Sequence, residues 1–214
     1  MISRRNSVAR FVKDPISPSE EISSYNLIAP DSFKARYVFE VAWEVVNKVG
    51  GIYTVIRTKA ASHVQELGDR YVLIGPLNEM CMRTEVDITE PTSEQLKRTI
   101  AKMRDHDIKI VFGRWLIEGY PSVVLFDIGS SAWRIDSWKK ELWDSCNIGV
   151  PVHDSECNDA VIFGGLVSWF LGEITSELSH FLDSLSLRHI PIVYCGQLRQ
   201  SGEQFGYHWF IDCQ

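Results

Sequence analysis

A lysine and two adjacent glycines stand between an apolar run and a helix-like segment, in the stretch EVVNKVGGIYTVIRTKA at 44–60. Gly50 and Gly51 let the backbone pass close to a ligand and turn its N–H groups outward. At the start of a helix such donors favour an anion such as a pyrophosphate, and Lys48 adds a positive charge. Together these residues suit a nucleotide diphosphate. A glycine pair at this kind of junction also occurs in tight turns that bind nothing, so the loop alone leaves both interpretations open.

The segments around this loop predict a parallel sheet. The run YVFEVAWE at 37–44 predicts a buried strand, the segment 54–68 a helix, and RYVLIGP at 70–76 a second strand. A strand, a short loop, a helix and a strand form a βαβ unit, whose parallel sheet is covered by helices on both faces. Further patterns predict a helix at 92–107, two strands within 108–129, a helix at 137–151 and a helix at 158–178 capped by Asn158 or Asp159. The sequence thus predicts an α/β fold with a mostly parallel sheet.

Composition argues against several classes of protein. The 214 residues carry a net charge of −6, which provides no basic face for nucleic acid. The longest nearly apolar stretch, 160–172, is too short to span a bilayer, and the charged N-terminus lacks the apolar core of a secretory signal. Five cysteines without CxxC spacing and six dispersed histidines predict free thiols, a cytoplasmic location, and no metal or other cofactor.

Five blocks of unusual composition carry a family resemblance. They are VFEVAWEVVNKVGGIYTVIRTKA, YVLIGP, FGRWLIEG, WKKELWDSCNIGVP and NDAVIFGGLVSWFLGE. Through these blocks, over about residues 37–173, the sequence resembles the eukaryotic glycogen (starch) synthase family of retaining glucosyltransferases.

The resemblance implies a domain organisation. Members of this family have two Rossmann-like domains that face one another in the GT-B arrangement, with the donor in the cleft between them. Residues 37–178 would form the Rossmann-like N-terminal domain, 1–36 a disordered regulatory tail and 179–214 a divergent tail of uncertain structure. The family's C-terminal domain carries its catalytic carboxylate, and we expect that domain to be absent from this sequence.

The resemblance also implies a reaction. Family members transfer glucose from UDP-glucose to the non-reducing end of an α-1,4-glucan, with retention of configuration and without a metal. Their Lys-x-Gly-Gly loop corresponds to Lys48, Gly50 and Gly51, which would therefore bind UDP-glucose. In metal-free transfer, fixed protein donors must stabilise the charge that develops on the leaving UDP.

Other residues are candidates for regulation and for partner binding. Ser7 follows Arg4 and Arg5 in the pattern that basophilic kinases recognise, and it is our candidate for regulatory phosphorylation. Trp138 and Trp143 lie on a predicted helix, where they either pack it or form a protein-binding surface. The resemblance favours a surface that docks glycogenin, and it implies a homo-oligomer in the full-length family. Within GRWLIEG, an ion pair is a simpler role for the two charged side chains than ligand contact.

Two functions from different classes remain. After residue 173 the recognisable blocks stop and no histidine-rich family motif follows. We therefore expect an N-terminal portion of a glycogen synthase, inactive when alone, because half of the cleft that orients the substrates is missing. The alternative is a catalytically inactive, truncated module that binds glycogenin or synthase subunits.

Overall fold

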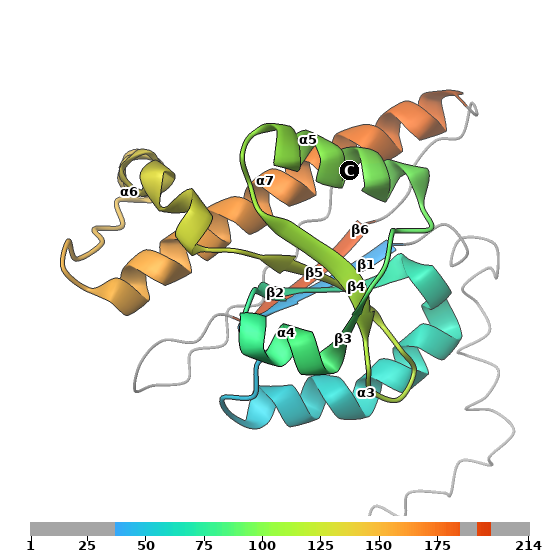
Figure 1. Cartoon of the computed structure of the whole chain (residues 1–214). Coiled ribbons are helices and arrows are strands. Elements are labelled where there is room, and N and C mark those ends of the chain that lie inside the picture. The colour runs from blue at the N-terminus through green and yellow to red at the C-terminus, as the bar shows by residue number, and fades with distance from the viewer. Residues whose placement is uncertain (1–36, 185–191, 198–214) are drawn as a thin grey trace, which may run out of the picture. The chain divides into compact units, whose positions relative to one another are not determined.

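A six-stranded β-sheet forms the centre of the fold (Figure 1). The computed structural model describes residues 37–184 and 192–197, all within the second of the two units, 1–34 and 35–214, into which the chain divides. The strand order is β3-β4-β5-β2-β1-β6. The bounds are Tyr37–Ala42 for β1, Tyr71–Pro76 for β2, Val86–Ile88 for β3, Ile110–Trp115 for β4, Ser122–Phe126 for β5 and Ile192–Gln197 for β6.

Parallel pairing dominates the middle of the sheet. Strand β1 runs parallel to both β2 and β6, and β2 runs parallel to β5, whereas β4 is antiparallel to β5 and to β3. All six residues of β2 and all five of β5 are buried, as expected for strands covered on both faces. The predictions of an α/β fold and a mostly parallel sheet are therefore confirmed, with an antiparallel edge at β3 and β4.

Helices cover both faces of this sheet (Figure 1). The described helices are α3 (Gly51–Leu67), α4 (Glu79–Glu85), α5 (Glu94–Asp105), α6 (Ile135–Cys146) and α7 (Ser155–Ser184), of which α6 packs on α7. Helices α5 and α7 lie on one face, where Phe126 meets Phe170 in one apolar core. Helix α3 lies on the other face, where Ile56 shares a second core with Leu73. Both cores rest on the same strands, so the sheet holds the two helical layers in place.

The start of α7 differs from the prediction. Neither Asn158 nor Asp159 caps this helix, which begins at Ser155 and extends past 178 to Ser184. Asp154 precedes it, and its carboxylate accepts a hydrogen bond of 3.0 Å from the backbone N–H of Cys157. That bond holds the pKa of Asp154 below its usual range. The prediction failed because the first helical turn is polar, and the helix was expected to begin only where the apolar run does.

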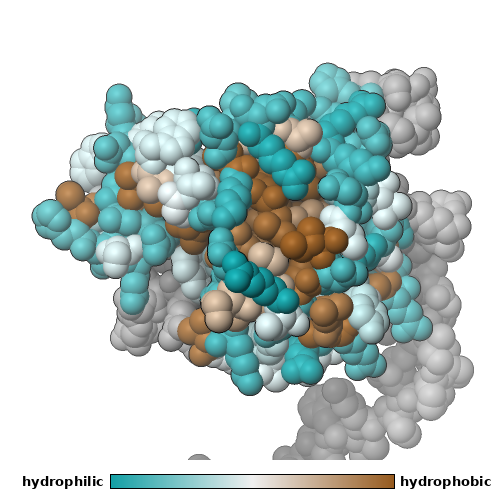
Figure 2. Space-filling view, viewed as in Figure 1, coloured by the Kyte–Doolittle hydropathy of each residue, from teal (hydrophilic) through white to brown (hydrophobic). Residues whose placement is uncertain are grey.

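Two short elements at the sheet edge had no strong sequence pattern. Helix α4 is capped by Asn78, whose side chain accepts from the N–H groups of Met80 and Cys81, and β3 follows it directly. As a three-residue edge strand, β3 offers little backbone for pairing with another chain. On the face of the molecule seen in Figure 2, apolar surface lies in the middle and hydrophilic side chains surround it. Strand β6 lies within 179–214, the segment whose structure the sequence left uncertain.

Helix α7 is long and apolar enough, by length and composition, to cross a membrane. Its apolar side chains nevertheless pack on the sheet, and Phe163, Leu166 and Phe170 are fully buried there. Such packing is the ordinary behaviour of a core helix in a globular domain. One such helix is weak evidence for a membrane span. The core contacts of α7 explain its apolar composition without a membrane.

A close contact joins α6 to α7. A Cβ atom added to Gly165 would lie 2.5 Å from the Trp138 ring, so the glycine admits the indole against the helix backbone. Trp138 is 9% exposed and belongs to the core that α7 forms with the sheet. The guanidinium of Arg134 lies over the rings of Trp138 and Trp169, at 5.3 and 4.3 Å from the ring centroids. This aromatic contact therefore fixes how α6 sits on α7.

Gly165→Ala is expected to lower the free energy of unfolding by about 1–3 kcal/mol, because the Trp138 ring must move to admit the methyl group. The matched control is Gly164→Ala, since no atom lies within 4 Å of a Cβ there. That change should raise stability by about 0.5–1 kcal/mol through helix propensity. Urea unfolding of both variants measures the difference, and equal effects would contradict the role assigned to the contact.

Candidate functional site

The glycine loop lies at the edge of the sheet where the parallel strands end. The loop follows β1, and the segments that follow β2 and β5 meet the same edge because these strands run parallel. The Asn78 side chain donates to that of Asn47 at 3.3 Å, which ties the segment after β2 to the loop after β1. The carboxyl edge of an open α/β sheet is where such folds bind ligands. The predicted binding residues therefore stand at the expected edge.

The structure brings the three predicted binding residues together at the start of α3. Helix α3 begins at Gly51, immediately after Gly50, and both glycines are exposed. Lys48 is also exposed, and it makes no hydrogen bond or ion pair with any residue that the structure describes. A positive charge with no partner among the described residues thus stands three residues before the first residue of α3, near the positive end of its dipole. This arrangement attracts an anion.

One buried carboxylate organises the glycine loop. Glu44 is 3% exposed, and its Oε2 atom accepts hydrogen bonds from the backbone N–H groups of Gly50 at 2.7 Å and Tyr53 at 3.0 Å. Helix geometry leaves the N–H groups of the N-cap and the first three helical residues without carbonyl partners. Glu44 satisfies two of these four. The amides of Gly51 and Ile52 make no hydrogen bond with the described residues, and they remain available to a ligand.

The loop contains a strained backbone position. Val46 has a φ of 54°, in the left-handed region that β-branched residues rarely adopt. Its side chain is nevertheless 1% exposed and belongs to the core beneath α3. Strain of this kind persists only where the surroundings over-determine the conformation, and it is common at binding sites. The packing of Val46 in the core therefore holds the loop before Lys48 in one conformation.

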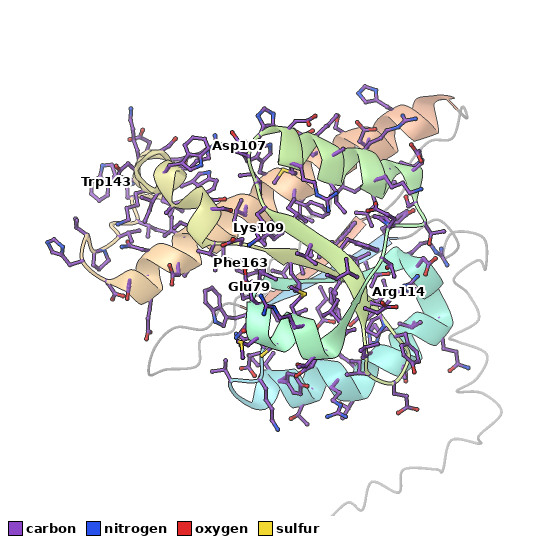
Figure 3. The ribbon with its side chains drawn as sticks, in the orientation of Figure 1. Glu79, Asp107, Lys109, Arg114, Trp143 and Phe163 are labelled. Carbon is purple, nitrogen blue, oxygen red and sulfur yellow. The ribbon has the colours of Figure 1, made fainter. Side chains whose placement is uncertain are left out.

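A second charged group lies on the same edge of the sheet. Lys109, immediately before β4, contacts Glu79 at 3.0 Å (Figure 3). It also contacts Asp127 at 3.2 Å. Both carboxylates raise the pKa of the Lys109 ammonium. Lys109 therefore differs from Lys48, because its charge is already paired. None of these three residues had a role in the sequence analysis, since their contacts join separate elements.

The opposite end of the Tyr53 side chain anchors α3 to α4. The Tyr53 hydroxyl donates to Glu85 at 3.0 Å, and the same carboxylate oxygen accepts from the Trp115 indole at 3.1 Å. Burial, and then the hydrogen bond to Glu85, raise the pKa of Tyr53. Tyr53 therefore links the glycine loop, through its backbone, to the sheet edge, through its hydroxyl.

The two charged residues of GRWLIEG do not pair with each other. Arg114 contacts Asp69 instead, and it also donates to the Tyr120 carbonyl at 3.3 Å. The hydrogen bond from Arg114 holds the pKa of Asp69 below its usual range. The predicted ion pair between Arg114 and Glu118 is wrong. Arg114 pairs instead with Asp69, which is 45 positions away in the sequence but close in the fold. The structural role that was expected for this arginine remains.

The two partner-interface candidates differ in exposure. Trp138 packs against α7, whereas Trp143 is 56% exposed on α6 and points away from the sheet (Figure 3). Trp133, in the short helix before α6, is 67% exposed. Trp143 and Trp133 are therefore the tryptophans of this region that a partner can reach.

Other expectations concern different parts of the chain. Ser7 and the predicted tail 1–36 lie outside the described residues, as does most of the segment 179–214. Among the described residues, no three His, Cys, Asp or Glu side chains form a group that could hold a metal ion. Asp159, a candidate cap in the sequence analysis, is exposed near the start of α7, where partial burial raises its pKa.

Comparison with known proteins identifies the family. The family model described as glycogen synthase matches residues 40–189. This chain belongs to the glycogen synthase family. The match runs beyond residue 173, where the recognisable sequence blocks end.

The glycogen synthase relatives are much longer than this chain. It is 56% identical over 140 residues to human liver glycogen [starch] synthase, covering 65% of this chain and 20% of that protein. It is 41% identical over 188 residues to glycogen [starch] synthase of Caenorhabditis elegans, covering 88% of this chain and 27% of that protein. The Neurospora crassa glycogen [starch] synthase is 44% identical over 169 residues. The chain therefore spans about a fifth to a quarter of these glycogen synthases.

The glycines of the glycogen synthase loop are expected to respond differently to substitution. A Cβ at Gly50 would lie 3.0 Å from Glu44 Oε1, so Gly50→Ala should displace that carboxylate and cost about 1–2 kcal/mol of stability. Nothing lies within 4 Å of a Cβ at Gly51, so Gly51→Ala should leave the stability equal or higher. Thermal unfolding of the two variants tests this order. A larger loss in Gly51→Ala would contradict it.

Proposed function

We propose that this chain provides the UDP-glucose loop of a glycogen synthase, which transfers glucose to the non-reducing end of an α-1,4-glucan with retention of configuration. The observation that carries this proposal is the exposed Lys48, which has no partner in the described part of the chain and lies beside the start of α3 at the carboxyl edge of a parallel sheet. Membership of the glycogen synthase family supports the same assignment. The loop chemistry and the family thus point to one substrate class.

Each loop residue has a specific part in this proposal. Lys48 pairs with a phosphate or the uridine of the donor, since its ammonium has no partner among the described residues. The amide of Gly51, at the first position of α3, donates to the sugar-phosphate. Gly50 admits the Glu44 carboxylate close to the backbone, and its own amide is held by that carboxylate. These fixed donors stabilise the negative charge that gathers on UDP as the glycosidic bond breaks.

The proposal extends beyond the residues that form the loop. The facing domain of the GT-B arrangement holds the catalytic groups, and donor and acceptor meet between the two domains. No metal or other cofactor is assigned a role in this reaction. We further place the protein in the cytoplasm, within a homo-oligomer, and under regulation by phosphorylation at Ser7.

Lys48→Ala is expected to weaken UDP binding by about tenfold or more, because the variant loses a charge-assisted contact with phosphate. Calorimetric titration of the chain with UDP measures the change. The control is Lys97→Ala, which removes an exposed lysine from α5 on the other side of the sheet. Equal UDP affinity in wild type and Lys48→Ala would reject the assignment of this loop.

A second function rests on the exposed tryptophans. Trp133 and Trp143 present large aromatic surfaces at one end of the fold, and aromatic side chains are frequent anchors in protein interfaces. We infer that a module lacking catalysis would use this surface to bind glycogenin or synthase subunits. Glucosyl transfer by the chain alone, abolished by Lys48→Ala, would exclude the module as the sole function.

In the module, Trp143→Ala should reduce capture of the chain by purified glycogenin several-fold, because an exposed anchor is lost. Lys48→Ala should leave capture unchanged. Leu116→Ala is the matched control, since Leu116 is 52% exposed on the connection between β4 and β5. A pull-down with immobilised glycogenin gives the comparison. Capture that is insensitive to Trp143 would argue against this surface.

A further inference from the structure

The conformation of the loop before Lys48 requires a force that maintains it. Val46 holds a φ of 54° while its side chain stays in the core, so relaxation of the backbone would pull an apolar group out of its packing. The turn itself has weak backbone support: Val45 N–H reaches Ala42 O at 3.3 Å, and Asn47 N–H reaches Glu44 O at 3.4 Å. These contacts are long, and they do not reach the glycines.

Glu44 supplies the strong contacts that span the loop. Its Oε2 atom accepts from Gly50 and Tyr53, so one side chain closes the chain from the end of the turn to the first turn of α3. The carboxylate also lies at the positive end of the α3 dipole. Hydrogen bonds to an ionised acceptor are roughly twice as strong as neutral ones, and burial removes the competition from water.

We propose that Glu44 is the positioning residue of the donor loop, an inference that rests on the proposed function. By holding the amides of Gly50 and Tyr53 inward, its carboxylate leaves the amides of Gly51 and Ile52 and the Lys48 ammonium to face the phosphates of a nucleoside diphosphate. Glu44 thereby divides the donors at this helix start into a structural pair and a binding pair.

The burial of Glu44 argues against a direct chemical role. At 3% exposure, with Oε2 shared by two backbone donors, the carboxylate has no open path to a sugar. The other oxygen, Oε1, would lie 3.0 Å from a Cβ on Gly50, so it also lies against the loop. Glu44 acts on the ligand only through the loop that it holds.

The first test measures the loop without any ligand. Amide hydrogen exchange, followed by NMR, should show protection of Gly50 and Tyr53 in the wild type and its loss in Glu44→Ala. Glu44→Gln keeps an acceptor oxygen and removes the charge, so it should retain intermediate protection. The matched control is Glu40→Gln, which alters a buried glutamate that contacts Lys59 and Tyr71 rather than the loop. Protection that survives in Glu44→Ala and in Glu44→Gln at the wild-type level would overturn the proposal.

The second test measures binding of UDP by the same four proteins. Affinity should fall by about tenfold or more in Glu44→Ala and by less in Glu44→Gln, in the order of the lost protection. It should stay at the wild-type value in Glu40→Gln at a temperature where all four are folded. Lost protection with unchanged UDP affinity would overturn the positioning role while leaving the proposed function intact. If the wild type binds no UDP, the proposed function and the donor role both fail, whereas the exchange data still decide whether Glu44 orders the loop.

Discussion

One carboxylate oxygen joins the end of β1 to the start of α3. Glu44 Oε2 receives two backbone N–H groups from the far side of the glycine loop, and it does so inside the protein, where an unpaired charge would be costly. The left-handed Val46, the close approach at Gly50 and the exposed Lys48 all lie within a few residues of this contact. The contact of Glu44 with these two N–H groups therefore sets the direction in which the glycine loop faces. The βαβ unit on either side provides a rigid frame, because β1 and β2 are buried in the same sheet.

Much of the fold could be predicted from the sequence, because its signals are local. The apolar runs at β1 and β2 and the glycine pair between β1 and α3 placed a parallel unit correctly. The position of Lys48, Gly50 and Gly51 at the start of a helix followed from the same pattern. Helix α7 was predicted, but its first turn was not, because the residues there are polar and lack the helical spacing of apolar side chains.

Contacts between distant residues could not be predicted in this way. Glu44 stands within an apolar segment, where its spacing says nothing about which amides it will meet. The only signal was a carboxylate in a run of buried residues, which requires a partner. Arg114 was assigned to the nearest acid in sequence, although Asp69 lies nearer in space. Trp138 and Trp143 share one helix, and the packing of Trp138 on α7 at Gly165 separates the core residue from the surface residue.

The place of β6 in the sheet affects the order in which the domain can form. This strand pairs in parallel with β1 along all six residues, yet about 150 residues separate the two strands in the sequence. During synthesis from the N-terminus, at roughly 5–20 residues per second, β1 and β2 emerge many seconds before β6. The outer edge of β1 therefore keeps unpaired backbone groups throughout the synthesis of the helical layers. The pairing of β6 with β1 is a late, long-range event. Until it occurs, the nascent domain is most exposed to wrong strand pairing at β1.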